Sequence, residues 1–263
     1  MRTLFPLILG LSLLACDDDK KPEKTPAIPP SAVAVVPPAA SPALSASSAT
    51  PTAKAERKPI VCPDGPNVVT DDPVMDGQLH IKLSKKPGET IKLSELANVK
   101  SLDLTQSKKL ATLDGCLIPK MTGLKHIFIG PGEYDDLSPI ANLVHLETVR
   151  AAASKVADLK PLEKLTMLDR LDLGRTPVRD LEIVGKLVNL TELQLDNTQV
   201  SDLSPLANCK KLEKLFLKNT MIVDINALRD LKNLKLLDIG GTQVVDVSPL
   251  GNLTSHGLKI TSK

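Results

Sequence analysis

Apolar and polar positions recur with one constant spacing through the last two thirds of the chain. Aspartates stand 22 residues apart, and a serine or threonine precedes each of them by four residues. The aspartates are Asp158, Asp180, Asp202, Asp224 and Asp246, and the hydroxyl residues are Ser154, Thr176, Thr198, Thr220 and Thr242. A fixed period of this length indicates a stack of small units, each too small to bury its own apolar face. The sequence therefore predicts a solenoid.

Each period combines an alternating apolar segment with a turn. Leu193 and Leu195 flank Gln194, which is the alternation of a short strand with both leucines on one face. The segment 202–206 then reads Asp-Leu-Ser-Pro-Leu, and its proline lacks the N–H that a sheet ladder requires. We therefore expect a tight turn or a single 3₁₀ turn after each strand.

This pattern resembles the leucine-rich repeat, in the short class found in bacterial internalin-like proteins. The resemblance covers residues 93–260, and six consecutive turn segments keep one register from Asp136 to Asp246. It implies an α/β-type solenoid that is mostly β, with about seven repeats in residues 93–263. The expected shape is a horseshoe with a parallel sheet on the concave side and turns or 3₁₀ segments on the convex side. The family's usual asparagine after the strand is replaced by serine or threonine, which we expect to hydrogen-bond the backbone of the adjacent coil.

The two ends of the repeat array depart from the pattern. The first repeat carries about three extra residues between Ser107 and Asp114, and the last repeat shifts by one residue at Leu258-x-Ile260. Residues 59–92 precede the array, and we expect them to form an N-terminal cap.

Residues 1–15 have the features of a signal peptide. Arg2 precedes an apolar stretch, from Leu4 to Leu14, that is too short to span a bilayer. The sequence Leu-Leu-Ala-Cys that ends at Cys16 resembles a bacterial lipoprotein signal box, which implies cleavage before Cys16 and its acylation, with palmitate among the expected chains. Several acyl chains on one cysteine give stable membrane anchoring. The alternative is an ordinary secretory signal in which Cys16 is incidental.

A lipoprotein signal predicts a bacterial cell-envelope location, at the inner or the outer membrane. The three aspartates 17–19 resemble the inner-membrane retention signal of enterobacterial lipoproteins, but other lineages sort differently, so the leaflet stays open. Residues 16–58 are rich in Pro, Ala and Ser and have too few large apolar side chains to form a core. They are expected to form a disordered tether between the anchor and the solenoid.

Three cysteines follow the lipidation candidate. Cys209 occupies a repeat position that leucine holds in other periods, so we expect a buried, reduced side chain. Cys62 precedes the first repeat and Cys116 lies in its turn. In an exported protein the two are candidates for a disulfide that clamps the cap to the array, with two free thiols as the alternative. No Cys-x-x-Cys motif is present, which disfavours a zinc or redox site.

Charge and motifs argue against several functions. The net charge is +2, with basic and acidic residues intermixed, which does not fit a nucleic-acid binder. The four histidines have no metal-ligand spacing, and no catalytic or phosphate-binding motif appears. The aspartate column suggests calcium at first sight, but its constant local context favours carboxylates that cap the turns. We expect no enzymatic activity, metal, cofactor or small-molecule substrate.

Side chains at the centre of each expected strand point away from the core, onto the concave side of the sheet. This column is Asp103, Phe128, Arg150, Asp172, Gln194, Phe216 and Asp238. The column two residues earlier is Ser101, His126, Thr148, Arg170, Glu192, Lys214 and Leu236. Exposed aromatics beside Arg and Asp are typical of interface anchors, although Phe also favours strands in general. The candidate contact residues are Phe128, Arg150, Arg170, Asp172, Gln194, Lys214 and Phe216.

These features predict a lipid-anchored envelope protein that recognises another protein through its concave face. The alternative is a structural or self-associating envelope component without a dedicated ligand. A third possibility, a regulatory subunit that lies over an enzyme, is disfavoured by the export signal. The membrane contact is expected at Cys16, and the identity of the protein partner is left open.

Overall fold

The computed structural model describes residues 60–107 and 110–262 of the 263-residue chain. These residues fall within one compact unit, residues 56–263. The expected signal peptide, the lipidation candidate Cys16 and the expected tether lie outside the described residues. None of the helices in the described part is long and apolar enough to cross a membrane.

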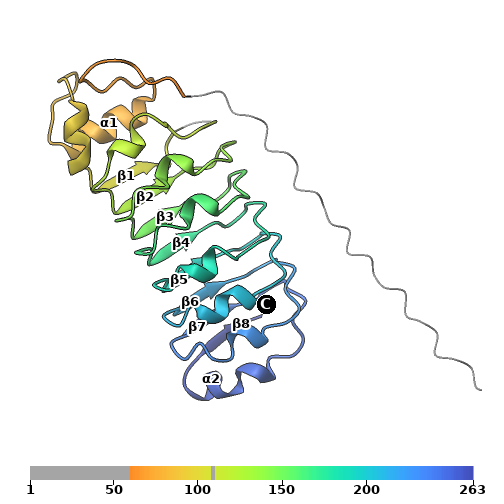
Figure 1. The fold of residues 1–263 in the computed structure, drawn as a ribbon. Helices are drawn as coiled ribbons and strands as arrows, with labels where there is room; N and C mark the ends of the chain where they lie inside the picture. The colour runs from red at the N-terminus through yellow and green to blue at the C-terminus, as the bar shows by residue number, and fades with distance from the viewer. Residues whose placement is uncertain (1–59, 108–109, 263) are drawn as a thin grey trace, which may run out of the picture. The chain divides into compact units, whose positions relative to one another are not determined.

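An open, fully parallel sheet of eight strands runs along the described part of the chain, with the strands in sequence order (Figure 1). The strands are β1 (Ser101–Leu104), β2 (His126–Ile129), β3 (Thr148–Arg150), β4 (Arg170–Asp172), β5 (Glu192–Gln194), β6 (Lys214–Phe216), β7 (Leu236–Asp238) and β8 (Lys259–Thr261). Strands β2 to β7 are paired at the 22-residue spacing, as Thr148 with Arg170. His126 pairs with Ser101 after three extra residues, and Lys259 pairs with Leu236 after one. The register shifts predicted at both ends are confirmed.

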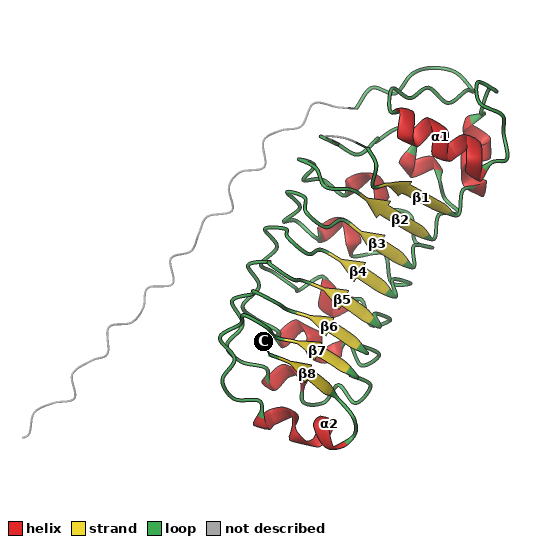
Figure 2. Ribbon diagram, turned by 180° about the vertical axis from the view of Figure 1, so that it is seen from behind, coloured by secondary structure: helices red, strands yellow, loops and turns green. Residues whose placement is uncertain are grey.

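One short 3₁₀ segment precedes each strand, on the opposite side of the coil from the sheet (Figure 2). They are η1 (Leu93–Asn98), η2 (Ile118–Lys120), η3 (Ser138–Ile140), η4 (Lys160–Leu162), η5 (Val184–Lys186), η6 (Ser204–Asn208), η7 (Asn226–Leu228) and η8 (Ser248–Leu250). The leucines and isoleucines of strands and turns form one continuous core. Leu193 and Leu195 are fully buried, and each such side chain contributes about 1.5–3 kcal/mol. Strands on one side and 3₁₀ turns on the other confirm the predicted solenoid.

The periodic aspartates begin the turns. The Oδ1 atom of each one accepts a hydrogen bond from the backbone N–H two residues later, as in Asp202 to Ser204 at 2.8 Å. The same contact occurs at Asp136, Asp158, Asp180, Asp224 and Asp246, at 2.7–2.9 Å. Within the described residues, no group of three or more His, Cys, Asp or Glu side chains is arranged to hold a metal ion. The expected capping role is confirmed.

The periodic hydroxyls have a different partner from the one expected. Thr198 Oγ1 donates to the carbonyl oxygen of Leu195, three residues earlier in the same coil, at 2.7 Å. The other members of the column make the same contact at 2.6–2.9 Å. The prediction of a bond to the adjacent coil was wrong, because the side chain is too short to reach past its own turn. These hydroxyls instead satisfy a carbonyl where the chain leaves the strand.

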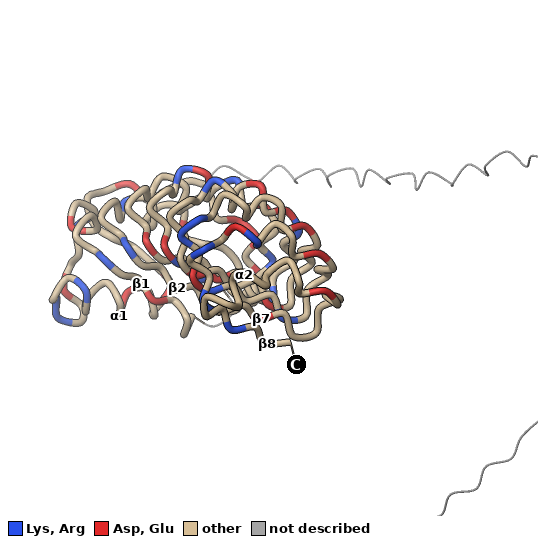
Figure 3. Tube along the Cα trace, turned by 90° about the horizontal axis from the view of Figure 1, so that it is seen from below, with Lys and Arg blue, Asp and Glu red and all other residues tan. Residues whose placement is uncertain are grey.

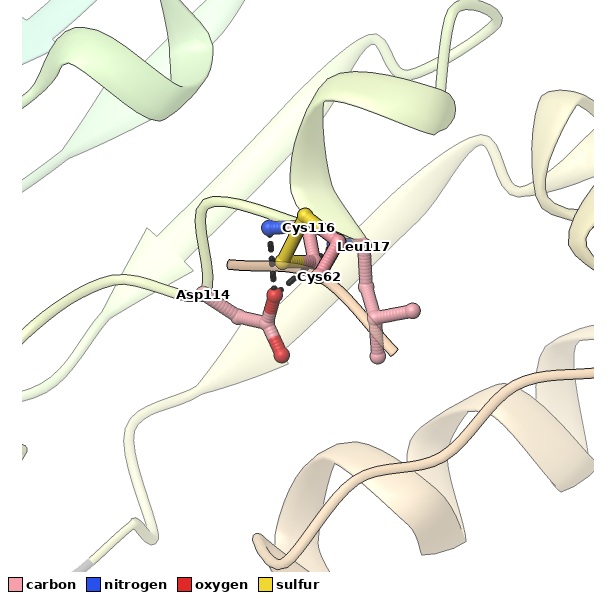
Figure 4. The surroundings of a disulfide bond; sticks show 4 residues. All are labelled: Cys62, Asp114, Cys116 and Leu117. Carbon is pink, nitrogen blue, oxygen red and sulfur yellow. Dashed lines mark hydrogen bonds between the residues drawn. A yellow bond between two sulfur atoms is a disulfide. The ribbon is translucent and has the colours of Figure 1, made fainter. Parts of the chain in front are cut away.

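A helix and a disulfide close the N-terminal end of the array. Helix α1 (Pro73–Lys82) lies against β1 and buries Met75 and Leu79. The structure joins the expected cysteine pair, Cys62 and Cys116 (Figure 4). Asp114 Oδ1 accepts hydrogen bonds from the N–H groups of Cys116 and Leu117, both at 2.8 Å, and thereby fixes the turn that carries Cys116. The start of the described chain is thus tied to the first repeat.

The C-terminal end has a shorter closure. Helix α2 (Gly251–Ser255) follows η8 directly and leads into β8. Leu253 is its one buried residue. The third cysteine of the described part, Cys209, is reduced and fully buried, as expected, and burial raises the pKa of its thiol to about 11.

Candidate protein-binding face

The sheet presents two aligned columns of side chains away from the core. Strand pairing places Phe128, Arg150, Asp172, Gln194 and Phe216 in one row across five adjacent strands. The row two residues earlier along the strands aligns His126, Thr148, Arg170, Glu192 and Lys214. We call the surface formed by these two rows the concave face. All seven predicted contact residues lie on it.

Three of the predicted residues form a contact group on the N-terminal half of the concave face. Arg150 Nε lies 3.2 Å from Asp172 Oδ2. The Arg150 guanidinium carbon lies 5.8 Å from the centroid of the Phe128 ring, which is the geometry of a cation–π contact. The guanidinium is thus held between an aromatic ring and a carboxylate. About half of the Arg150 side chain stays exposed, at 51%, so it remains available to a partner.

Glu192 connects three further residues in the middle of the concave face. Its carboxylate accepts a hydrogen bond from Gln194 Nε2 at 3.0 Å and lies 3.3 Å from the Lys214 ammonium. Burial favours the neutral acid, but these two contacts outweigh it and lower the pKa of Glu192 below its ordinary value. Arg170, on the adjacent strand, is 63% exposed and lies 3.4 Å from Asp169.

The sequence had placed Glu192 in a concave column without selecting it as a contact candidate. Glu192 matters because its carboxylate contacts both Gln194 and Lys214, and only the structure shows these contacts. Asp169 lay outside both predicted columns. Its column just before the strands is charged except at Thr191, and its other members are Lys125, Glu147, Glu213 and Lys235. Two ion pairs join members of this column, Lys125 to Glu147 at 2.7 Å and Lys235 to Glu213 at 2.8 Å.

A hollow of about 500 Å³ opens on the concave face over β1 to β5. Its lining includes five of the seven predicted residues: Phe128, Arg150, Arg170, Asp172 and Gln194. Lys214 and Phe216 lie outside it. Its lining is mostly polar and charged, whereas small-molecule pockets are lined predominantly by apolar side chains, so the hollow fits recognition of a protein surface better than enclosure of a ligand.

The two concave phenylalanines are half-buried, so they are less exposed than the sequence suggested. Phe216 lies between Gln194 and Asp238 in its row. Asp196 lies two residues after Gln194. Its pKa is raised because the carboxyl group is partly buried and because Asp238 and Asp172 carry negative charge nearby. Both halves of the concave face thus carry one phenylalanine, and the two arginines lie in the N-terminal half.

The rest of the surface mixes charges of both signs. In Figure 3 basic and acidic positions are both spread over the trace. This distribution agrees with the small net charge of +2. An arrangement of half-buried aromatics, partly exposed arginines and carboxylates is suited to binding a complementary protein surface.

Comparisons with known proteins agree with the fold. Residues 166–208 match the family model described as leucine-rich repeats in two copies. Internalin C2 of Listeria monocytogenes is 26% identical, with a TM-score of 0.61, over 73% of this chain and 93% of that chain. An internalin (inlF) of the same organism is 27% identical, with a TM-score of 0.62, over 70% of this chain and 54% of that chain.

A more distant neighbour shows the fold alone. A leucine-rich-repeat protein of Leptospira interrogans is 20% identical, with a TM-score of 0.50, over 64% of this chain and 50% of that chain. The comparison with curated protein sequences gave no match. The matched repeats and the bacterial neighbours together support a bacterial leucine-rich-repeat protein, and the described residues form a leucine-rich-repeat solenoid.

Proposed function

We propose that this chain is a lipid-anchored cell-envelope protein that recognises another protein through its concave face. Leucine-rich-repeat proteins bind protein partners in general, and the fold by itself does not name the partner. The observation that carries the proposal is the hollow lined by Phe128, Arg150, Arg170, Asp172 and Gln194. Its residues combine partly exposed charge with aromatic surface on a rigid sheet.

The anchoring part of the proposal rests on the sequence. The lipoprotein-like signal before Cys16 and the Pro-, Ala- and Ser-rich segment 16–58 fit a membrane anchor followed by a tether. Location at the inner or outer membrane of a bacterial envelope, and the absence of enzymatic activity, stay predictions. A chain with this layout would present its concave face some distance from the membrane.

A photo-crosslinking side chain at Gln194 tests recognition in living cells. Gln194 lines the hollow, whereas Asn208 in η6 is exposed and lies away from the sheet. We expect a discrete adduct from position 194 and none from position 208. The adduct should disappear when Phe128→Ala and Arg150→Ala are combined, since these residues line the same hollow. Mass spectrometry of the adduct identifies the partner.

Adducts of equal yield from both positions, or none from Gln194, would contradict recognition through the concave face. They would favour the alternative of a structural component without a dedicated ligand. Folding of each variant is checked by circular dichroism before the comparison.

Labelling with an alkyne analogue of palmitate tests the anchor separately. We expect label on the wild-type chain and none on Cys16→Ser, while Cys209→Ala keeps the label because that thiol is buried. Label that persists in Cys16→Ser, or a wild-type chain that takes up none, would refute acylation at this residue. Neither result bears on the concave face.

A further inference from the structure

The last strand of the sheet has an open hydrogen-bonding edge. The N–H of Lys259 donates to Lys235 O at 2.9 Å, and Thr261 O accepts from Ile239 N–H at 2.8 Å, so these groups face β7 and the loops next to it. Backbone groups of successive strand residues point to opposite sides. The N–H and C=O of Ile260 therefore point outward, where no strand pairs with β8 in the described residues. An open edge of this kind readily pairs with another strand.

The core is also partly open at this end. Val247 is 41% exposed, although the five residues that hold its place in earlier repeats are at most 4% exposed. Those five are Leu137, Leu159, Leu181, Leu203 and Ile225. Val244 is half-buried, whereas its counterparts Val156, Val178, Val200 and Ile222 are fully buried. In the inner repeats the next coil covers these positions.

Two neighbouring valines extend the apolar surface. Val245 is 95% exposed and Val223, at the same position of the preceding repeat, is 60% exposed. The equivalent residues of the two repeats before them are Arg179 and Ser201. Helix α2 covers the other part of this end, where Leu250, Leu253 and Leu258 are at most 7% exposed. The uncovered part is thus confined to the side of Val244 and Val247.

The opposite end of the stack does not offer a matching edge. Helix α1 lies at the β1 end in both views, packed against that strand (Figures 1 and 2). A head-to-tail array of copies would require β1 to be free, so it is blocked. An interface between two β8 edges is possible, and it closes at two copies.

The β8 edge is complementary to itself. Antiparallel pairing about a two-fold axis at Ile260 lets the two Ile260 residues exchange both N–H···O bonds as a hydrogen-bonded pair. Lys259 then lies opposite Thr261 of the second copy, so no like charges face each other. Because the axis reverses the strand direction, it places the uncovered side of each copy, with Val244 and Val247, opposite the α2 side of the other copy.

We propose that two copies of this chain associate end to end through β8, with Val244 and Val247 of each copy covered by the other. The dimer has one continuous sheet of sixteen strands, twice the eight of one chain, and two concave faces. Dimerisation through β8 does not depend on partner binding at the concave face.

Sedimentation of the full chain carrying Cys16→Ser, which removes the acylation site, tests the association from micromolar to near-millimolar concentration. We expect a reversible dimer. Val247→Asp should abolish it by placing two carboxylates in the contact, whereas Val188→Asp, at a valine 48% exposed in the middle of the stack, should leave it intact. Circular dichroism confirms that both variants fold. A monomer at all concentrations, or a dimer that Val247→Asp does not weaken, would overturn the proposal.

Disulfide trapping tests the register. Lys259→Cys and Thr261→Cys chains should cross-link when they are mixed, because the two positions face each other across the axis. Each variant alone should cross-link poorly, since like positions are then about 8 Å apart, beyond the usual Cα separation of a disulfide. Efficient cross-linking of either variant with itself, or none in the mixture, would contradict the two-fold pairing at Ile260.

Discussion

At its N-terminal end the solenoid is closed by a ten-residue helix and a disulfide, whereas a five-residue helix covers only part of its C-terminal end. Asp72 caps α1 through hydrogen bonds from Val74 and Met75, and it also accepts one from Ser107 Oγ in the first repeat at 2.8 Å. Helix α2 has no side-chain cap. The N-terminal closure is therefore tied to the array by several independent contacts.

This difference between the two ends arises because a repeat at the end of a stack has a neighbouring coil on one side only. The inner coils bury their apolar residues against both neighbours, so each end needs cover from elsewhere. The chain supplies that cover at the N-terminus with residues of its own. At the C-terminus Val247 stays 41% exposed.

Removal of the disulfide should produce the largest change. Cys62 and Cys116 are 54 residues apart, and a cross-link over a loop of this length stabilises the folded state by about 4 kcal/mol on the chain-entropy account. We expect Cys62→Ser combined with Cys116→Ser to lower the free energy of unfolding by about this amount in urea titrations. Reducing agent should have the same effect on the wild type and none on the double variant. An unchanged midpoint would show that the cap is held without the disulfide.

Equivalent truncations at the two ends should differ clearly. Leu79→Ala in α1 removes a fully buried side chain and should cost about 2–5 kcal/mol. Val247→Ala should cost less than about 1 kcal/mol in the monomer, because that side chain is already partly in water. Urea unfolding at low protein concentration, where association does not contribute, measures both. Equal losses would mean that the C-terminal end is as well covered as the N-terminal end.

The hydroxyl column offers a matched pair of smaller changes. Thr198→Val leaves the carbonyl of Leu195 without its 2.7 Å donor in a buried site, which should cost about 1–2 kcal/mol. Thr242→Val removes the same contact, to Ile239 O at 2.7 Å, from a half-buried site in the last repeat. Water can replace the hydroxyl there, so the loss should be about half as large. A larger loss at Thr242 would contradict the open C-terminal end.

The smallest expected effect is a pH dependence confined to the N-terminal cap. Nδ1 and Nε2 of buried His80 lie 2.9 Å from Asp76 O and 3.0 Å from Glu89 O, and both carbonyls only accept. The bond to Asp76 O is the main cause that raises the pKa of His80 above 6.5, with burial opposing it. Since the folded pKa exceeds the unfolded one, the contribution is complete below the unfolded pKa and is lost as pH rises through the folded value.

Thermal unfolding through the neutral range measures this contribution. We expect the melting temperature of the wild type to fall as pH rises past the pKa of His80, and His80→Gln to flatten the slope. His145→Gln, which changes an exposed side chain, serves as the control and should keep the wild-type slope. A slope that His80→Gln leaves unchanged would assign the pH dependence to other groups.

Several features of the molecule were predictable from local spacing. The alternation around Gln194 fixed which face of β5 is buried, and Pro205 marked the turn that became η6. The capping bond from Ser204 to Asp202 followed from the same short segment. Each depends on residues a few positions apart, so the chain itself contains the information.

Other features were not predictable in this way. No helix was predicted over Pro73–Lys82, which lies before the periodic region. The residue before each hydroxyl adopts a left-handed backbone, with φ from 54° to 70°, at Ala153, Arg175, Asn197, Asn219 and Gly241. Asn and Gly favour this conformation, but Ala and Arg do not, so only the repeat position indicates it.

By itself, the sequence determined the repeat, the strand register and the two concave columns, because a constant period fixes which residues meet in neighbouring coils. The tertiary structure decided which members of those columns interact, as in the contact of Arg150 with Phe128 and Asp172. It also decided which copies of an equivalent apolar position are covered. Leu203 and Val247 hold the same place in their repeats, yet only Leu203 is buried, since burial depends on the coil stacked next to a residue.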